Sequence, residues 1–305
     1  MTEQKWLRSS LRRLSQRLRT WGHPASPPTV RRLLKKRTYT LKVNRKTKEL
    51  GQKHPDRETQ FADIEQQKQA AREKGLPMIS VDTKKKELIG DFKNAGQTWR
   101  QEPEAVNTHD FPHTAVARAV PYGIDDLQRN HGAVCVGTSA DTPRFAVAAI
   151  AWWWETEGRV AYPDADGLQI FADAGGSNGC RPRAWKHALQ TQLADRFGLH
   201  VTVCHYPTGC SKWNPIEHRL FSFISLNWAG TPLRTLAIVL ACLRGTSTST
   251  GLSVSATLLE DTFLLGHRIS KQEMAALHLE LHATCPRWNY TVHPRLPLAS
   301  CASGD

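Results

Sequence analysis

The chain has 305 residues, 41 of them Lys or Arg and 28 Asp or Glu, so its formal net charge is +13. Residues 1–50 hold 15 of the basic side chains and only 2 of the acidic ones, so the whole excess lies there, as in a nucleic-acid-binding module joined to a neutral domain. No apolar run approaches the roughly 20 residues of a membrane span, and the basic N-terminus lacks the apolar stretch of a signal peptide, which excludes the membrane-spanning and secreted classes.

Two amphipathic helices are predicted in the basic segment. Apolar residues recur at helical spacing from residue 4 to residue 21, and Gly22 then ends the first helix. After a Pro-rich turn, Ser26 is the predicted N-cap of a second helix that begins at Pro27. This helix has apolar residues on one face and basic residues on another: Val30, Leu33 and Leu34 against Arg31, Arg32, Lys35 and Lys36. Residues 1–50 are therefore a helix-turn-helix candidate whose second helix enters the major groove of DNA; a solvated amphipathic hairpin is the alternative.

The remainder of the chain reads as a polar connecting helix followed by strands and helices. The connecting helix spans residues 51–77, and strand patterns begin at Met78. Two strands separated by the hairpin-like interval QRNH come next. They are followed by the helix RFAVAAIAWWW, the strand LQIFADAG, the helix RPRAWKHALQTQLADRFG, the strand LHVTVCHYP and a last helix. The predicted order is thus β, β, β, α, β, α, β, α.

This order predicts an α/β fold with a mixed sheet and helices on its faces. Three antiparallel strands followed by helix-linked strands are the order of the RNase H-like fold, which we assign to residues 78–230. In that fold the first and fourth strands lie side by side at the centre of the sheet. Residues 231–305 are predicted to form a C-terminal helical region and tail, and the helix-turn-helix segment is a small all-α module in front.

The seven cysteines are scattered and form no C-x-x-C pair, which suits reduced thiols and predicts a cytoplasmic location. The pair Cys204-His205 together with Cys210 is compatible with zinc. A Cys at the end of a strand is more often a small buried hydrophobe, however, and we favour that interpretation.

Two carboxylates stand at positions suited to a shared divalent cation. Asp173 follows the buried strand 168–172 and opens a Gly-rich turn, and Glu217 lies in the first turn of a later helix. In that helix Asn214 is the predicted N-cap and Pro215 the first helical residue. Structural alternatives exist, because Asp before Gly-Gly is commonly a turn residue and Glu217 is placed to close a capping box with Asn214. A third acid on another strand favours metal binding.

Three upstream aspartates compete for the role of the third acid. Asp141 lies only 32 residues before Asp173, too near for the intervening elements. Asp110 leaves enough room, but its polar flanks and the following Pro112 make a poor strand. Asp82 follows a clean apolar run and lies 91 residues upstream. We choose Asp82, with Asp110 as the fallback, and expect the chosen acid to converge with Asp173 and the acid of the last helix.

Several long strings occur in order from about residue 6 to residue 290: SPPTVRRLL, HPDRETQF, ISVDTKKKELIGDFKNAG, PYGIDDL, DTPRFAVAAIAWWW, ADAGGSNGCRPRAWK, SKWNPIEHRLFSFI and WNYT. By these strings the chain resembles the DDE transposases of bacterial insertion sequences, specifically the ISAzo-thirteen family, which is distantly similar to mariner-type transposases. The resemblance implies excision and insertion of the family's own element by metal-dependent phosphoryl transfer. The acids Asp82, Asp173 and Glu217 are intact, which leaves this chemistry open to the chain.

The chain departs from the family pattern in three respects. In the tract before Glu217, the residues Thr208, Cys210 and Pro215 differ, and Asp125 stands where an aromatic residue is common. Family members also carry a longer region before the helix-turn-helix. We therefore expect this N-terminal segment to be shortened, which affects recognition of the element more than catalysis.

The resemblance implies a mechanism that the residues can support. Asp82, Asp173 and Glu217 would hold two Mg²⁺ ions, for which Mn²⁺ can substitute, and these ions activate the nucleophile and stabilise the leaving oxygen. Lys212 and Arg219 flank the helix acid as candidate phosphate contacts, with a solvated surface as the equal alternative for Arg219.

The expected partners are DNA at the ends of the element and at the target, together with further copies of the chain, because two ends must be brought together. The expected location is the cytoplasm, in association with the nucleoid. Two other functions remain open: a shortened, catalytically silent regulator that occupies the ends of the element, and an RNase H-like nuclease without strand transfer.

Overall fold

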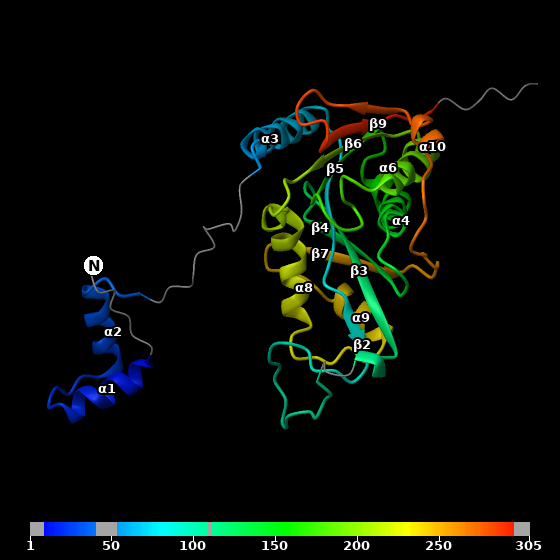
Figure 1. The fold of residues 1–305 in the computed structure, drawn as a ribbon. Coiled ribbons are helices and arrows are strands. Elements are labelled where there is room, and N and C mark those ends of the chain that lie inside the picture. The colour runs from blue at the N-terminus through cyan, green and yellow to red at the C-terminus, as the bar shows by residue number, and fades with distance from the viewer. Residues whose placement is uncertain (1–8, 41–53, 109–111, 296–305) are drawn as a thin grey trace, which may run out of the picture. The chain divides into compact units, whose positions relative to one another are not determined.

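The computed structural model describes residues 9–40, 54–108 and 112–295 (Figure 1). The chain divides into two compact units, Met1–Lys53 and His54–Asp305. Across the described residues, no helix combines the length and the apolar character needed to cross a membrane.

Two helices make up the described part of the first unit: α1, Leu11–Thr20, and α2, Pro27–Lys36. The side chain of Ser26 accepts a hydrogen bond from the backbone amide of Thr29 (3.3 Å), so the predicted cap and the predicted start of the second helix are confirmed. Gly22 adopts a φ of +79°, a left-handed conformation that suits glycine, and it ends the first helix as predicted.

The second helix is amphipathic, although one apolar residue lies outside its buried face. Val30 is buried, whereas Leu33, which was expected to be buried with it, is 49% exposed. The basic residues of this helix are all exposed: Arg31, Arg32, Lys35 and Lys36. Ser15 of α1 donates a hydrogen bond to the carbonyl of Ala25 (2.6 Å) and so ties α1 to the turn before α2. The N-terminal part of the first predicted helix, residues 4–8, lies outside the described residues.

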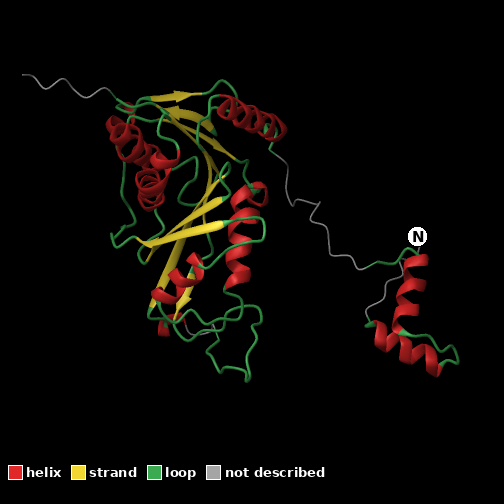
Figure 2. Ribbon diagram, turned by 180° about the vertical axis from the view of Figure 1, so that it is seen from behind, coloured by secondary structure: helices red, strands yellow, loops and turns green. Residues whose placement is uncertain are grey.

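Among the described residues of the second unit, nine strands form one sheet (Figures 1 and 2). They are β1 Met78–Thr83, β2 Glu87–Ile89, β3 Ala117–Asp126, β4 His131–Gly137, β5 Gly167–Ala172, β6 His200–His205, β7 Ser253–Leu258, β8 Leu279–Leu281 and β9 Asn289–Val292. Their order is β7-β4-β3-β1-β5-β6-β9-β8, and β2 pairs with β3. β1 is antiparallel to β3 and parallel to β5, which is parallel to β6. This is the RNase H-like arrangement, so the predicted fold class is confirmed.

Helices cover both faces of the sheet (Figure 2). One face carries two helices that each run through a π-helical turn into a short end: α4 Pro143–Trp153, Trp154–Gly158 and α5 Arg159–Ala161, then α6 Arg183–Leu189, Gln190–Ala194 and α7 Asp195–Phe197. The other face carries the π-helical turn Glu217–Phe221, α8 Ser222–Asn227 and α9 Leu236–Arg244. Short 3₁₀ turns lie at Pro112–Thr114 and Ser211–Trp213.

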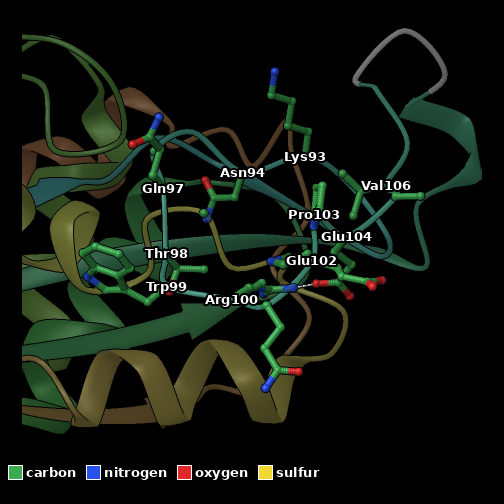
Figure 3. Close-up of a pocket in the computed structure, with 15 residues that line it drawn as sticks. Lys93, Asn94, Gln97, Thr98, Trp99, Arg100, Glu102, Pro103, Glu104 and Val106 are labelled. Carbon is green, nitrogen blue, oxygen red and sulfur yellow. Dashed lines mark ion pairs between the residues drawn. The ribbon is translucent and has the colours of Figure 1, made fainter.

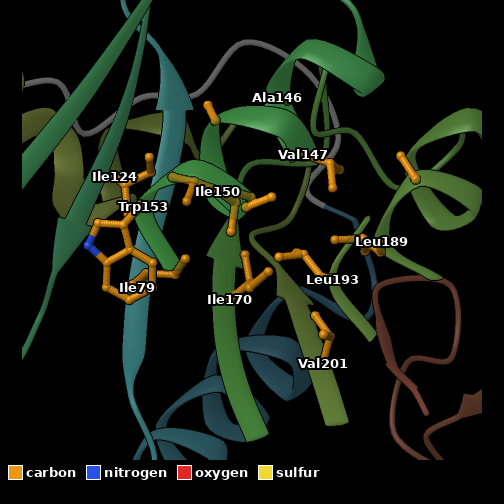
Figure 4. Close-up of a cluster of buried hydrophobic side chains, with 14 of the residues drawn as sticks. Ile79, Ile124, Ala146, Val147, Ile150, Trp153, Ile170, Leu189, Leu193 and Val201 are labelled. Carbon is orange, nitrogen blue, oxygen red and sulfur yellow. The ribbon is translucent and has the colours of Figure 1, made fainter. Parts of the chain in front are cut away.

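Alternation along the strands divides the apolar side chains between two cores. In β4, Ala133 and Cys135 join the cluster under α4 and α6, whereas Val134 and Val136 join the cluster under α8 and α9. Figure 4 shows the first cluster, in which Trp153 of α4 is almost fully buried. Because both faces are covered, the central strands read as nearly continuous apolar runs.

The polar helix before the first strand, α3 Arg57–Glu73, belongs to the second unit. Its Ile64 packs in a third buried cluster with Met78, Phe171, Cys204 and Cys210. The two cysteines of the zinc alternative are thus buried among apolar side chains, as the favoured interpretation predicted.

The C-terminal region differs from its prediction, because it supplies strands as well as the helices α9 and α10 (Lys271–Ala275). β7 pairs in parallel with β4, and β9 pairs antiparallel with β6, so both extend the sheet. The prediction of a helical region over 231–305 is therefore wrong in this respect. Strands of four to six residues give a weak periodic signal, and their pairing depends on partners more than 80 residues away.

Candidate active site

Asp82 and Asp173 come together because two central strands pair. β1 and β5 are parallel neighbours, and their last register pair is Val81 with Ala172. Asp82 and Asp173 are the next residues, so both stand at the carboxyl ends of adjacent strands, where neighbouring backbones lie about 4.8 Å apart. Two acids that are 91 positions apart in the sequence are thus neighbours in the fold.

A buried hydrogen-bond network joins the start of the Glu217 helix to β1. Ser80 Oγ donates to Asn214 Oδ1 (2.5 Å) and accepts from the amide of Ile216 (3.2 Å). Asn214 Nδ2 donates in turn to the carbonyl of Val81 (3.2 Å). Because these bonds lie immediately before the first acid in β1, they bring Glu217 toward the two aspartates.

The prediction that the side chain of Asn214 caps the Glu217 helix is wrong. The helix starts at Pro215 as predicted, but the side chain of Asn214 bonds β1 and not a helix amide. The oxygen that the amide of Ile216 needs comes instead from Ser80, a residue of another element. The capping-box alternative for Glu217 required the side chain of Asn214 to bond a helix amide, and that side chain bonds β1 instead.

Close packing presses this helix against the strands of the acids. Gly123 of β3 is the register partner of Asp82, and a Cβ at that position would overlap the ring of Phe221 and press on Ile216. The absence of a side chain there lets the helix approach directly beside the first acid. Glu217 opens a π-helical turn, a bulged geometry that occurs frequently at functional sites.

Burial and mutual repulsion perturb the acids. Burial, and after it the charge of Asp173, raises the pKa of Asp82 to about 8. Burial also raises the pKa of Asp173, although hydrogen bonds from the amide of Gly175 and the side chain of Asn178 (3.0 Å) favour its charged form. The charge of Glu217 raises the pKa of both aspartates further. The site therefore favours a positively charged ligand.

The donor set fits a hard divalent cation. In the part of the chain that the structure describes, no group of three His, Cys, Asp or Glu side chains is arranged to hold a metal ion by itself. Mg²⁺ does not need such an enclosure, because it keeps several waters and is commonly held by one or two carboxylates together with substrate phosphates. Two half-buried carboxylates at neighbouring strand ends, with a third nearby, suit that mode of binding.

The other two candidate aspartates differ in their placement. Asp141 lies at the edge of the site, where Thr83 Oγ1 donates to its Oδ1 (3.1 Å) and Lys86 Nζ lies 3.3 Å from its Oδ2. Its charge also raises the pKa of Asp82. Asp110, the fallback for the first acid, lies outside the described residues.

Basic side chains lie beside Asp82 and Asp141 in a groove that the sequence analysis did not single out. A cavity of about 450 Å³ is lined by Asp82, Asp141, Lys84, Lys85, Lys86 and Arg118, among others. A neighbouring cavity of about 560 Å³ shares Asp141, Gly176 and Ser177 with it and is also lined by Arg183, His267 and Arg268. The run of three lysines that begins two residues after Asp82 was the signal that could have identified this groove.

The residues flanking Glu217 have different surroundings. Lys212 lies on the turn Ser211–Trp213, with its Nζ 5.2 Å from the centre of the Trp213 ring. The side chain of Arg219 is 39% exposed, and its Nε donates to Oδ2 of the fully buried Asp125 (2.8 Å). Asp125, which departs from the family pattern, thus forms an ion pair with Arg219. Burial raises the pKa of Asp125 to about 6, against the opposing effect of Arg219.

A larger cavity, of about 860 Å³, lies between residues 93–106 and the segment of Gly230 and Pro232. Figure 3 shows Trp99 in this loop and the ion pair between Arg100 and Glu104. None of the three candidate acids lines this cavity, so its size does not make it the catalytic site.

Comparison with known proteins gives one family and a group of solved structures. The family described as "Rhodopirellula transposase DDE domain" matches residues 1–294. No curated protein matches the chain. A Mos1 transposase paired-end complex with the left transposon end is 13% identical, with a TM-score of 0.44, and the match covers 76% of this chain and 64% of that one. A pre-cleavage Mos1 transpososome is 11% identical (TM-score 0.45, 76% and 65% covered). The chain thus spans less than two thirds of the Mos1 transposase chain.

Proposed function

Because the chain belongs to the family of the Rhodopirellula transposase DDE domain, we propose that it is the transposase of a bacterial insertion sequence. It cuts DNA at the ends of its own element and joins them to target DNA by metal-dependent phosphoryl transfer. The observation that supports this best is the position of Asp82 and Asp173 at the ends of adjacent parallel strands, with the Glu217 helix hydrogen-bonded to the same strand through Ser80.

The two aspartates of the proposed site have distinct supporting contacts. Asp82, Asp173 and Glu217 bind two Mg²⁺ ions, or Mn²⁺ in their place. When bound, these ions supply activation of the attacking oxygen and stabilisation of the leaving oxygen. Asn178 orients the carboxylate of Asp173 through its hydrogen bond to Oδ1, and the backbone amide of Thr83 does the same for Asp82 (2.7 Å).

DNA is the partner at two places on the chain. The exposed basic residues of α2, Arg31, Arg32, Lys35 and Lys36, contact the end of the element, and residues 1–50 act as the DNA-binding segment. The cations of the groove, chiefly Lys85, Lys86 and Arg118, hold the phosphates of the strand that is cut, together with Lys212 in the turn before the Glu217 helix. Residues 78–230 carry the catalytic acids, and a homo-oligomer assembles on paired ends, in the cytoplasm at the nucleoid.

Strand cleavage and joining by the full chain test the proposal. The protein is incubated with Mg²⁺ and a plasmid that carries the element with its native flanks, together with a second, target plasmid. We expect breaks at the ends of the element and joined products, both absent with EDTA and with Asp173→Asn. Protein that binds the ends but never cuts them would point to the regulator, and cutting without any joined product would point to the nuclease.

A further inference from the structure

We propose that Trp185, Tyr290 and His205 form a buried hydrogen-bond relay that fixes the backbone of Asp173 and thereby aims its carboxylate at the metal site. The inference rests on the proposed function, since it assigns a positioning role toward the same site. None of these three residues lies in the cavities beside the acids. They come instead from α6, β9 and the end of β6.

The chemistry of the end groups determines the direction of each hydrogen bond. The indole N–H of Trp185 can only donate, and it donates to the hydroxyl oxygen of Tyr290 (2.8 Å). The backbone carbonyl of Asp173 can only accept, so the His205 Nδ1 at 2.9 Å from it carries the hydrogen. The other ring nitrogen of His205, Nε2, is then an acceptor, and the hydroxyl of Tyr290 donates to it (3.1 Å). Each polar atom of the relay has a partner of the correct kind.

The hydrogen bond from His205 to Asp173 lies directly after the last paired residues of β5 and β6. The register of β5 and β6 ends at the pair of Ala172 and His205, and the amide of Tyr206 donates to the carbonyl of Ala172 (2.8 Å). The next carbonyl, that of Asp173, begins the Gly-rich turn, beyond the last register pair of the two strands. The side chain of His205 supplies a donor at this point. The plane of the Asp173 peptide, and with it the direction of the Asp173 side chain, is therefore set by the ring of His205.

The backbone of His205 is also fixed by hydrogen bonds. Its amide donates to the carbonyl of Trp288 (3.0 Å), and its carbonyl accepts from Gln60 Nε2 (2.8 Å). Trp185, Tyr290 and His205 are all 0% exposed, so no bulk water competes for their hydrogen bonds. A neutral ring with one donor and one acceptor in a dry site has a single orientation, which makes it a rigid support for a metal-ligating residue.

The test compares two Tyr→Phe variants that differ in whether the hydroxyl belongs to the relay. Tyr290→Phe removes the central hydroxyl. The matched control, Tyr206→Phe, removes a similarly buried hydroxyl that has no hydrogen-bond partner within the described residues. The full chain is titrated with Mg²⁺, and the concentration that gives half of the maximal rise in melting temperature is recorded. This readout reports the metal site without requiring turnover.

We expect Tyr290→Phe to raise the half-saturating Mg²⁺ concentration by roughly three- to tenfold. This is less than the roughly 10- to 100-fold typical of a residue that bonds a metal ligand directly, because the relay acts through the backbone. Tyr206→Phe is expected to match wild type. A folded Tyr290→Phe with the wild-type Mg²⁺ response overturns the relay. A wild-type chain that shows no Mg²⁺ response sensitive to Asp173→Asn overturns the metal site itself, and the relay with it.

A second pair of variants keeps the inference testable if Tyr290→Phe does not fold. His205→Asn places an amide N–H near the position of the ring Nδ1–H and can still donate to the Asp173 carbonyl, whereas His205→Leu cannot. We expect His205→Asn to respond to Mg²⁺ at a concentration several-fold lower than His205→Leu. Equal half-saturating concentrations in the two variants would show that His205 serves packing alone.

Discussion

At the scale of single residues, the proposed site places like charges together in a half-buried position. Asp82 and Asp173 each raise the free energy of the other's charged form, and Glu217 adds to both. In the absence of a cation this arrangement disfavours the folded protein, because desolvation and repulsion act in the same direction. A cation that binds only the folded state offsets that cost. The charges that are proposed to bind the metal ions therefore lower the stability of the metal-free protein.

Removing the first acid should separate its catalytic role from its effect on stability. Asp82→Ala is expected to abolish Mg²⁺-dependent cleavage while the melting temperature without Mg²⁺ stays equal to that of wild type or rises. Asp110→Ala is the comparison and is expected to keep measurable cleavage and the Mg²⁺-induced rise in melting temperature. If Asp110→Ala loses both and Asp82→Ala keeps both, Asp82 is not the first acid.

A pH dependence of stability is expected from Asp125. Its folded-state pKa of about 6 lies above its ordinary value of 3.8, because burial outweighs the pairing with Arg219. The folded state therefore binds the proton more tightly, and wild-type stability should fall as the pH rises from about 4 to about 6 and then level off. Asp125→Asn should flatten this fall and stabilise the protein at pH 7.5 by up to about 2–3 kcal/mol, since one pKa unit corresponds to about 1.4 kcal/mol.

Urea unfolding of wild type and Asp125→Asn at pH 4.5 and pH 7.5 measures this difference. A variant that is less stable than wild type at pH 7.5 would show that the ion pair with Arg219 outweighs the burial of the carboxylate.

At the scale of elements, buried polar contacts attach helices to the sheet. Gln60 of α3 donates to Asn289 Oδ1 (2.6 Å) and accepts from Asn289 Nδ2 (2.7 Å), and the same Nδ2 lies 2.8 Å from Asp63 Oδ2. Gln60 and Asn289 are both 0% exposed. A helix that looked like a polar connector is thus docked on β9 by its polar residues, through a reciprocal pair of amides.

Two glutamines of the same helix test this docking. Gln60→Ala takes a buried amide partner from Asn289 and from the carbonyl of His205, which should cost about 2–3 kcal/mol of unfolding free energy. Gln69→Ala removes an exposed hydrogen bond to Glu73 (2.8 Å) and should change the free energy by less than about 0.5 kcal/mol. Denaturant unfolding compares the two, and similar losses in both would mean that the buried amide pair adds nothing to stability.

The basic helix α2 should determine how DNA affinity depends on salt. Arg31→Ala and Lys35→Ala are each expected to weaken binding to the ends of the element. Each should also lower the slope of log affinity against log salt by roughly one for every phosphate that the helix no longer binds. Lys74→Ala, an exposed lysine after α3, serves as the control and should leave the slope unchanged. Binding curves over several salt concentrations give the slopes. Unchanged slopes for both α2 variants would place this helix away from DNA.

At the scale of the whole molecule, the excess positive charge and the candidate catalytic acids lie in different parts of the chain. The net charge of +13 is carried by residues 1–50, and the segment with the candidate acids is balanced. In the proposed function, long-range attraction to DNA therefore depends on the first unit, whereas the reaction depends on a few side chains of the second. The two functions should be separable by mutation.

Asp173→Asn tests that separation. The variant keeps the shape of the side chain but loses a negative charge, so we expect cleavage to fall below detection. The affinity for the ends of the element should change by less than about threefold, since affinity rests mainly on the N-terminal cations. Gel-shift titration and cleavage assays of the same preparation measure both. Cleavage at the wild-type rate would remove Asp173 from the site.

The sequence alone determined the features that depend on near neighbours. The cap at Ser26, the start of α2 at Pro27 and the left-handed Gly22 each follow from residues a few positions away. The order of strands and helices likewise predicted the mixed sheet, because hydrophobic periodicity is a local signal. The position of Asp173 directly after a buried strand belongs to the same class of feature.

Only the tertiary structure decided which distant residues meet. Ser80 bonds Asn214 across 134 positions, Asp125 pairs with Arg219 across 94, and Gln60 bonds Asn289 across 229. The strands β7 and β9 also depend on their pairing with β4 and β6, because the hydrophobic pattern of four to six residues is too short to specify a strand. A polar side chain can satisfy its hydrogen bonds in many ways, and the choice among them depends on the neighbours that the chain topology provides, which no local pattern encodes.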